Sequence, residues 1–238
     1  QMKSLPAGFN GCKILFITDM HIEKIGCLAD RIVSIARQED YDYCILGGDY
    51  SFGFDISNPA IRQRLSEVLE FLKEKCRVFG ILGNHDEYQC AEILSRFGVE
   101  MLINEHVCLE KEGDKMYLVG VDDYHFFRAA ELKEAGAGIP NGAFRIIISH
   151  SPELYKEASA AGYSLYLAGH THGGQICLPG SIAIVANARV PRKMVKGRWE
   201  YRGMAGYTSC GAGASIVPMR FFCQPEVVLL TLRKDAHT

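Results

Sequence analysis

Five of the eight histidines of this chain lie in short motifs that also carry aspartate and asparagine. Imidazole nitrogens combined with carboxylate and amide oxygens form a mixed donor set. Such a set suits manganese, iron or zinc better than magnesium or calcium. The pattern therefore predicts a site for two metal ions. In chain order the motifs are Asp19-Met20-His21, Gly48-Asp49, Gly83-Asn84-His85-Asp86, His150 and Gly169-His170-Thr171-His172.

Two metal ions about 3.5–4 Å apart can hold a phosphoryl oxygen and turn a bridging water into a nucleophile at neutral pH. Asp49 has two carboxylate oxygens and can bridge both ions. We expect His85 to act on the substrate instead of a metal, by stabilising phosphoryl oxygens or by protonating the leaving group. Asp86 is expected to hold the other ring nitrogen of His85 and so to fix its tautomer.

Each motif alone is a weak signal. The pairs D-x-H and G-D occur by chance in many chains, a lone H-x-H is more often a surface pair, and G-N-H-D reads first as a turn. The prediction of a metal centre rests on the whole set, in this order and at the ends of strands.

Most of these motifs directly follow an apolar run that is typical of a buried strand. The carboxyl ends of strands in open α/β sheets meet at one crevice, which is where such folds place their sites. We therefore expect the motif residues to converge. The predicted strands are Lys13–Thr18, Tyr43–Gly47, Val78–Leu82, Arg145–Ser149 and Ser164–Ala168.

The remaining pattern predicts one α/β domain over residues 1–238, with a core from about residue 13 to residue 232. The clearest helix spans Asn58–Lys75, with a proline near its start and apolar residues on one face. After His172 the pattern turns to β structure, with strands expected at Ser181–Val185, Trp199–Arg202 and Glu226–Leu232.

Charge and composition exclude some classes of protein. The net charge of −2 argues against the strongly basic surface of a nucleic-acid-binding protein, so no stable nucleic-acid binding is expected. Five basic residues in Arg189–Arg198 favour equally a solvated face and a contact with phosphate or anionic lipid head groups. Phe221-Phe222 is expected in the core. The loop Asp122–Arg128 is interpreted as solvated, with a substrate contact through His125 or Arg128 as the alternative.

The nine cysteines form no CxxC pair and are scattered, which indicates reduced thiols and a reducing compartment. No apolar run approaches the ~20 residues that span a bilayer. We expect a cytoplasmic protein or one peripheral to a membrane. The chain starts with Gln1-Met2, so an anchor on the native N-terminus stays open.

The motif set resembles the calcineurin-like metallophosphoesterase superfamily, whose pattern D-x-H, G-D, G-N-H-[DE], H, G-H-x-H is present without substitution. The resemblance implies a four-layer α/β/β/α sandwich with two mixed β-sheets, and a centre of two divalent ions, Mn, Fe or Zn. It also implies His85 as the catalytic histidine. The implied ligands are Asp19, His21, Asp49 and His172 for the first metal, and Asp49, Asn84, His150 and His170 for the second.

Residues 169–176 and 220–232 are similar to the bacterial YkuE-like branch of this superfamily. The similarity weakens between Pro191 and Gly213, so the substrate of a relative does not transfer. Nucleotide-linked lipids, cyclic nucleotides, glycerophosphodiesters and phospholipids all stay open. Several relatives are tethered to membranes, which makes association with a membrane surface an expectation.

We expect a dinuclear metal-dependent phosphoesterase, namely a phosphodiesterase or a pyrophosphate-bond hydrolase with a metal-bridging water or hydroxide as nucleophile. Its partner would be a phosphoester substrate, nucleotide- or lipid-linked. The alternative is a non-catalytic scaffold of the same fold. Such scaffolds usually lose a catalytic residue, notably the equivalent of His85, and this chain keeps them all.

Overall fold

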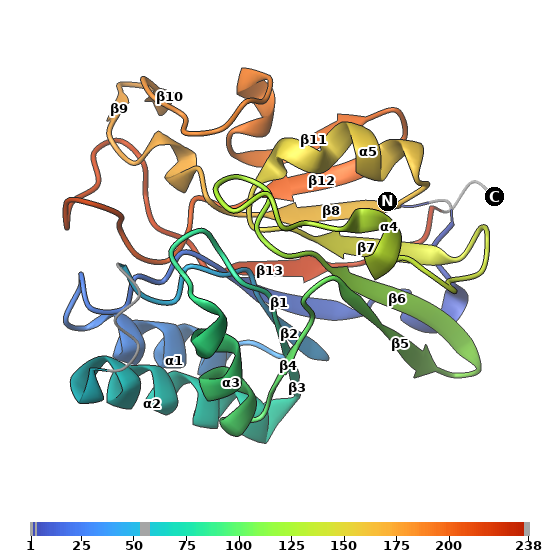
Figure 1. Cartoon of the computed structure of the whole chain (residues 1–238), viewed down its shortest axis with the longest axis horizontal. Helices are drawn as coiled ribbons and strands as arrows, with labels where there is room; N and C mark the ends of the chain where they lie inside the picture. The colour runs from blue at the N-terminus through green and yellow to red at the C-terminus, as the bar shows by residue number, and fades with distance from the viewer. Residues whose placement is uncertain (1, 3, 53–57, 236–238) are drawn as a thin grey trace.

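Two β-sheets pack face to face in the computed structural model, which describes residues 2, 4–52 and 58–235 (Figure 1). The first sheet has the strand order β13-β1-β2-β3-β4. Strands β1 to β4 run parallel, and β13 is antiparallel to β1. The bounds are β1 Lys13–Ile17, β2 Tyr43–Leu46, β3 Arg77–Gly80, β4 Val99–Met101 and β13 Val228–Thr231.

The second sheet has the order β11-β12-β8-β7-β6-β5. Its inner strands β12, β8, β7 and β6 are parallel, whereas β11 and β5 pair antiparallel at the two edges. The bounds are β5 Glu105–Lys111, β6 Asp114–Gly120, β7 Phe144–Ile148, β8 Leu165–Ala168, β11 Gly197–Tyr201 and β12 Met204–Thr208.

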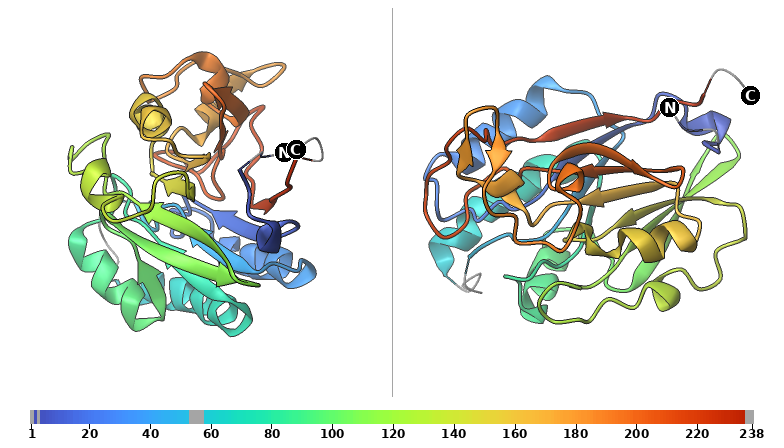
Figure 2. Two further views of the ribbon diagram at one scale, coloured as in Figure 1. Left: turned by 90° about the vertical axis from the view of Figure 1, so that its right-hand side faces the viewer. Right: turned by 90° about the horizontal axis from the view of Figure 1, so that it is seen from above.

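Helices cover the outer faces of both sheets (Figure 2). Helices α1 (Leu28–Gln38), α2 (Pro59–Lys75) and α3 (Tyr88–Arg96) pack on the first sheet, and the shorter α4 (Leu132–Ala135) and α5 (Tyr155–Ala160) pack on the second. The start of α2 is fixed by Asn58, whose side chain accepts a hydrogen bond from the backbone N–H of Ala60 at 2.9 Å.

Alternation along the strands divides the core into layers. In β1, Leu15 and Ile17 pack against the helices of the first sheet, whereas Ile14 and Phe16 face the second sheet. In β7, Ile146 and Ile148 face the first sheet. Successive side chains of a strand point to opposite faces of the sheet. In the central strands both sets of side chains are apolar and buried, because each sheet is covered on both faces. The predicted four-layer α/β/β/α sandwich with two mixed sheets is confirmed.

The C-terminal third differs in detail from the prediction. The strand expected at Ser181–Val185 is only Ile182–Ala183 (β10), which pairs with Cys177–Leu178 (β9) in a small hairpin. Strand β12 was not predicted, because Gly206 interrupts its pattern. There the Trp199 indole occupies the space of the missing side chain, since a Cβ on Gly206 would lie 2.3 Å from the ring.

No helix in the described residues is long and apolar enough to span a bilayer.

Candidate metal centre

The motif residues lie at the carboxyl ends of five strands drawn from both sheets. Asp19, Asp49 and Asn84 follow β1, β2 and β3 of the first sheet. His150 and His170 follow β7 and β8 of the second. The predicted site is therefore not the crevice of one sheet, because it forms where the ends of two packed sheets meet.

One group of donors is compact and buried. Asp19, His21, Asp49 and His172 each offer a ligand atom, and these atoms all lie within 4.8 Å of one another. His21 Nε2 is 3.5 Å from Asp49 Oδ2, and His172 Nε2 is 3.3 Å from Asp19 Oδ1. This group has the same members as the predicted ligand set of the first metal.

A second group adjoins it on the other side of Asp49. His150 Nε2 lies 3.2 Å from Asp49 Oδ2, and the His150 and His170 rings are 5.2 Å apart. His150 Nδ1 lies 2.8 Å from the Gly47 carbonyl, and His170 Nε2 lies 2.6 Å from the Asn187 carbonyl. A carbonyl only accepts hydrogen bonds, so each of these ring nitrogens must carry the proton and donate it. The other nitrogen of each ring then keeps its lone pair free to bind a metal ion.

A further observation indicates that these residues can hold a cation. Among the described residues, the buried side-chain atoms without a hydrogen-bond partner include Asn84 Oδ1 and His150 Nε2 at this centre. A buried polar atom that lacks a partner costs about 1–3 kcal/mol. A divalent ion bound beside Asp49 would take both atoms as ligands. The donor set matches the preferences of Mn²⁺, iron and Zn²⁺.

Burial and the neighbouring charges set the protonation of the centre. Burial lowers the pKa of His21 and His170 to about 4, and burial together with Arg220 lowers that of His172 to about 3. Burial alone would lower the pKa of His150 too, but the Asp49 carboxylate outweighs it and raises that pKa to about 10. Three of the four buried histidines are therefore neutral at pH 7, the form that binds metal.

We expect the free energy of unfolding of the metal-free protein to fall as the pH drops from about 6.5 to about 4. In this window the unfolded chain protonates His21, His170 and His172 at their ordinary pKa of 6.5, whereas the folded chain keeps them neutral. The contribution of these three histidines to the free energy of unfolding is thus fully present above pH 6.5. It is lost as the pH falls toward their pKa values in the folded protein, about 3 to 4. Burial raises the pKa of Asp86 to about 8 and also raises that of Asp122, so these two carboxyl groups act in the opposite direction to the three histidines, whose effect we expect to be larger.

The measurement is the urea midpoint of chelator-treated protein at several pH values across that window. The stabilisation from His150 is complete below pH 6.5 and is lost only as the pH rises toward about 10, so it does not affect this window. A midpoint that stays constant or rises between pH 6.5 and pH 4 would contradict the prediction.

The backbone at the candidate metal ligands has an unusual conformation. Five of these residues, none of them glycine, have a positive φ: Asp19 51°, His21 37°, Asp49 56°, His170 68° and His172 49°. Such residues cost about 1–3 kcal/mol each and gather at functional sites. The turns bring the side chains back over the strand ends toward one another. Gly83 permits the same approach, because a Cβ there would lie 2.3 Å from Asp49 Oδ1.

The role predicted for Asp86 differs from what the structure shows. Its buried carboxylate accepts hydrogen bonds from the backbone N–H groups of Asp49 (2.7 Å), Gly83 (2.8 Å) and Tyr50 (3.1 Å). These groups, and not the ring of His85, are its partners. Asp86 therefore holds the loop after β2 against the loop after β3, and it positions the candidate ligands Asp49 and Asn84 without contacting the His85 ring.

Asp86→Ala is expected to destabilise the protein by about 3 kcal/mol or more, because it leaves three buried N–H groups without an acceptor at about 1–3 kcal/mol each. Asp86→Asn keeps one acceptor oxygen and should recover part of the loss. Urea unfolding of both variants checks this. If Asp86→Ala left the unfolding midpoint unchanged and lowered only turnover, the carboxylate would act on His85 after all.

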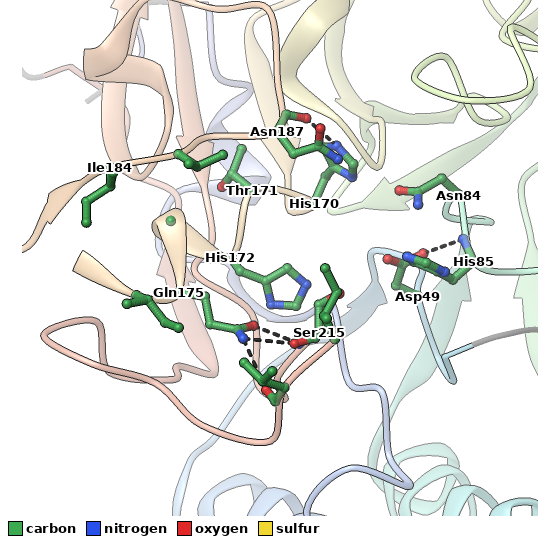
Figure 3. A pocket seen from close by; sticks show the side chains of 15 residues that line it. Asp49, Asn84, His85, His170, Thr171, His172, Gln175, Ile184, Asn187 and Ser215 are labelled. Carbon is green, nitrogen blue, oxygen red and sulfur yellow. Dashed lines mark hydrogen bonds between the residues drawn. The ribbon is translucent and has the colours of Figure 1, made fainter.

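His85 faces the open side of the centre. Its backbone N–H donates to Asp49 Oδ1 at 2.9 Å, and its ring lies 5.4 Å from the His21 ring and 4.6 Å from the Phe52 ring. The loop after β3 thus places both Asn84 and His85 at the wall of one cavity (Figure 3).

A cavity of about 620 Å³ opens beside the centre. One side is lined by Asp49, Asn84, His85, His170 and His172 (Figure 3). The other side is apolar and comes from the β9–β10 hairpin and from the loop after β12. Its apolar residues are Ile176, Ile184, Val185, Ile216 and Val217.

Arg220 is a residue of this site that the sequence pattern did not identify. Its guanidinium donates to the carbonyls of Cys210 (2.6 Å) and His172 (3.2 Å), and Nη2 lies 3.2 Å from His172 Nδ1. Arg220 thereby ties the loop of the last motif to the loop after β12. Its contacts with His172 bridge 48 positions of the chain, and no local spacing signals such a contact.

The loop Asp122–Arg128, interpreted as solvated, is exposed only in part: Phe126, Phe127 and Arg128 are exposed, whereas the other four residues are buried or half-buried. Asp123 is buried and accepts hydrogen bonds from the backbone N–H groups of His125, Phe126 and Phe127. His125 Nδ1 lies 2.7 Å from Glu153 Oε2, and its ring is 4.2 Å from the His170 ring. The loop therefore borders the metal centre and supports the alternative, a position next to the substrate.

Comparisons with known proteins agree with this geometry. The family model described as calcineurin-like phosphoesterase matches residues 12–174. Phosphodiesterase YaeI of Escherichia coli is 29% identical, with 92% of this chain and 82% of that protein aligned. The uncharacterized metallophosphoesterase YkuE of Bacillus subtilis is 27% identical over 96% and 82%. The fold resembles a dimetal phosphatase from Danio rerio with a TM-score of 0.57, 13% identity and 95% and 94% coverage.

Proposed function

Because the chain belongs to the calcineurin-like phosphoesterase family and is a metal-dependent phosphoester hydrolase, we propose that it hydrolyses phosphodiesters or pyrophosphate bonds with two divalent ions. One observation carries the proposal. Asp49 lies between two groups of donors, and the second group contains the partnerless atoms of Asn84 and His150. A single ion at the first group would leave those atoms unsatisfied.

Each side chain has a defined part in this proposal. Asp19, His21 and His172 would hold one ion, Asn84, His150 and His170 would hold the other, and Asp49 would contact both. Bound ions of this kind polarise the phosphoryl oxygen and lower the pKa of a water placed between them. His85 would meet the phosphoryl oxygens or protonate the leaving oxygen from the open side of the centre.

The cavity supports a substrate with groups on both sides of the phosphorus. Its volume of about 620 Å³ exceeds what a phosphate ion needs, and its far wall is apolar. A phosphomonoester leaves that wall unused, whereas a diester or a pyrophosphate places its second substituent there. The name of the relative YaeI, a phosphodiesterase, points to the same class. Nucleotide-linked and lipid-linked esters both meet this description.

The test is the hydrolysis of bis-p-nitrophenyl phosphate beside p-nitrophenyl phosphate, with Mn²⁺, Zn²⁺ or iron added and with chelator. The expected result is turnover that prefers the diester, stops with chelator and accompanies a metal content near two ions per chain. Turnover that prefers the monoester would overturn the diester assignment. If the protein binds no metal, the alternative of a non-catalytic scaffold is favoured. The complete set of candidate ligands and the presence of His85 argue against that alternative.

A further inference from the structure

Large apolar side chains gather around the mouth of the cavity. In the β9–β10 hairpin and the chain that follows it, Leu178, Ile184 and Val185 are 51%, 56% and 69% exposed. In the loop after β12, Ile216 is 75% exposed, and Phe221 and Phe222 are also exposed. The expectation that Phe221-Phe222 lies in the core is therefore wrong. We call these two segments, residues 176–185 and 215–222, the apolar rim.

A third apolar segment flanks the rim. Phe126 and Phe127 are exposed on the loop that also places His125 against His170. In Figure 1 and in the right-hand view of Figure 2, the rim lies at the end of the molecule opposite the chain termini. Contiguous exposed apolar patches are rare on soluble monomers and mark sites of protein or membrane contact.

The apolar rim is anchored to the metal centre. Gln175, next to the last metal motif, donates its side-chain amide to Ser215 O (2.8 Å) and accepts from the Ser215 N–H (2.7 Å). Its backbone carbonyl accepts from the Phe221 N–H at 3.0 Å. The exposed side chains therefore stand on hydrogen-bonded backbone at a fixed position beside His172.

The same rim continues into the cavity. Ile184, Val185 and Ile216 are largely exposed and also line the cavity that holds the metal ligands. Apolar side chains thus extend from the cavity wall to the outer surface, beside the polar lining residues Gln175, Asn187 and Ser215. An acyl chain that follows them would leave its phosphoester at the candidate metal centre.

Basic side chains adjoin the rim in the segment that follows the hairpin. Between Ile176 and Pro225 the chain has seven lysine and arginine residues and one acidic residue, Glu200, although the whole chain has a net charge of −2. Arg192 and Lys196 line a hollow of about 370 Å³ together with Ile182 and Ile184 of the hairpin. The Lys196 ammonium also donates to the Ser181 carbonyl in the hairpin turn. Basic side chains beside exposed apolar ones match an anionic lipid surface.

We propose that the apolar rim and the neighbouring basic residues Arg192, Lys193 and Lys196 form a membrane-docking surface, which seats the mouth of the cavity on an anionic lipid bilayer. Apolar side chains enter the interface, and the basic side chains contact lipid phosphates. The substrate that this arrangement admits is a phosphoester of a bilayer lipid. This last step rests on the proposed hydrolase function, whereas the docking itself does not.

A bilayer fits this surface better than a partner protein. The rim forms the apolar wall of the cavity and continues to its mouth, so a protein that covered the rim would block the way along that wall to a substrate. A bilayer covers the same rim and supplies the substrate through it. The excess of positive charge in this segment, on a chain that is negative overall, also has its complement in an anionic leaflet.

The test is flotation of the whole chain with vesicles of phosphatidylcholine, with and without phosphatidylglycerol, at low and high salt. The apolar variant is Leu178→Ser/Met219→Ser/Phe222→Ser, and the charge variant is Arg192→Glu/Lys193→Glu. Matched controls on the helical face are Ile35→Ser, an exposed isoleucine of α1, and Arg62→Glu/Lys73→Glu on α2. Thermal unfolding of every variant shows that it is folded.

We expect the wild type and the controls to float with anionic vesicles and to be released by salt. Binding should weaken by about fivefold for each basic residue removed and further for each reversed charge, and the apolar variant should lose it. Absence of wild-type binding at low salt, or equal loss in the controls, would overturn the proposal. So would a wild-type dimer that the apolar variant breaks, because the rim would then join two copies of the chain. Binding is measured without turnover, so an inactive enzyme does not affect the result.

Discussion

Asp49→Asn is expected to abolish phosphodiester hydrolysis, with a loss of about 10³-fold or more. Asp49 is buried between the two donor groups, with Oδ2 at 3.5 Å from His21 Nε2 and 3.2 Å from His150 Nε2. An amide keeps the shape of the side chain but removes its charge and leaves one donor atom for metal. Bound metals contribute several kcal/mol to a transition state, and each 1.36 kcal/mol is tenfold in rate.

Metal analysis of the purified variant separates this explanation from a loss of folding. We expect Asp49→Asn to carry clearly less metal than the wild type and to show a smaller rise in melting temperature when Mn²⁺ is added. Asp30→Asn, an exposed aspartate of α1, is the matched control and should change neither value. Full turnover with a full metal content in Asp49→Asn would refute the bridging role.

His85→Ala is expected to lower turnover by about 10²–10⁴-fold while metal content stays near that of the wild type. The His85 ring packs against His21 and Phe52 on the open side of the centre, and only its backbone N–H contacts the Asp49 carboxylate. Alanine keeps that N–H. The variant therefore removes a group that faces substrate and leaves the ligands in place.

The leaving group distinguishes the two possible actions of His85. If the imidazole protonates the departing oxygen, the loss in His85→Ala should be larger for an alkyl ester than for a p-nitrophenyl ester, whose leaving group needs little protonation. If it only stabilises phosphoryl oxygens, both esters should lose alike. His106→Ala, on β5, is the matched control. A variant that retains wild-type turnover on both esters would exclude His85 from the chemistry.

The two substitutions together give a pattern that a scaffold cannot show. Asp49→Asn should lose metal and activity, whereas His85→Ala should lose activity alone. Loss of metal in both would mean that the loop after β3 collapses without the His85 ring. That outcome would move His85 from the substrate side to the support of Asn84.

The sequence predicted the parts of this protein that local pattern controls. Five strands were predicted because both of their faces are buried, which makes each a continuous apolar run. The candidate ligands were identified because they follow those runs. The Asn58–Lys75 helix was found from its periodicity and its cap. The types of the donor atoms predicted a site for divalent metal. The family resemblance then supplied the four-layer architecture, which the structure confirms.

Only the tertiary structure decided features that depend on contacts between distant segments. It placed β1–β3 and β7–β8 in two sheets and joined their ends at one centre. It made the Asp86 carboxylate the acceptor of hydrogen bonds from three backbone N–H groups, because the loops after β2 and β3 meet there. It placed Arg220 on His172. Phe221 and Phe222 have the sequence of a core segment, yet they are exposed, because the backbone of Phe221 is hydrogen-bonded to the loop of the last metal motif and no layer of the sandwich covers that face. Periodicity reports which residues are apolar, whereas burial depends on which other segments arrive, and that is a property of the whole fold.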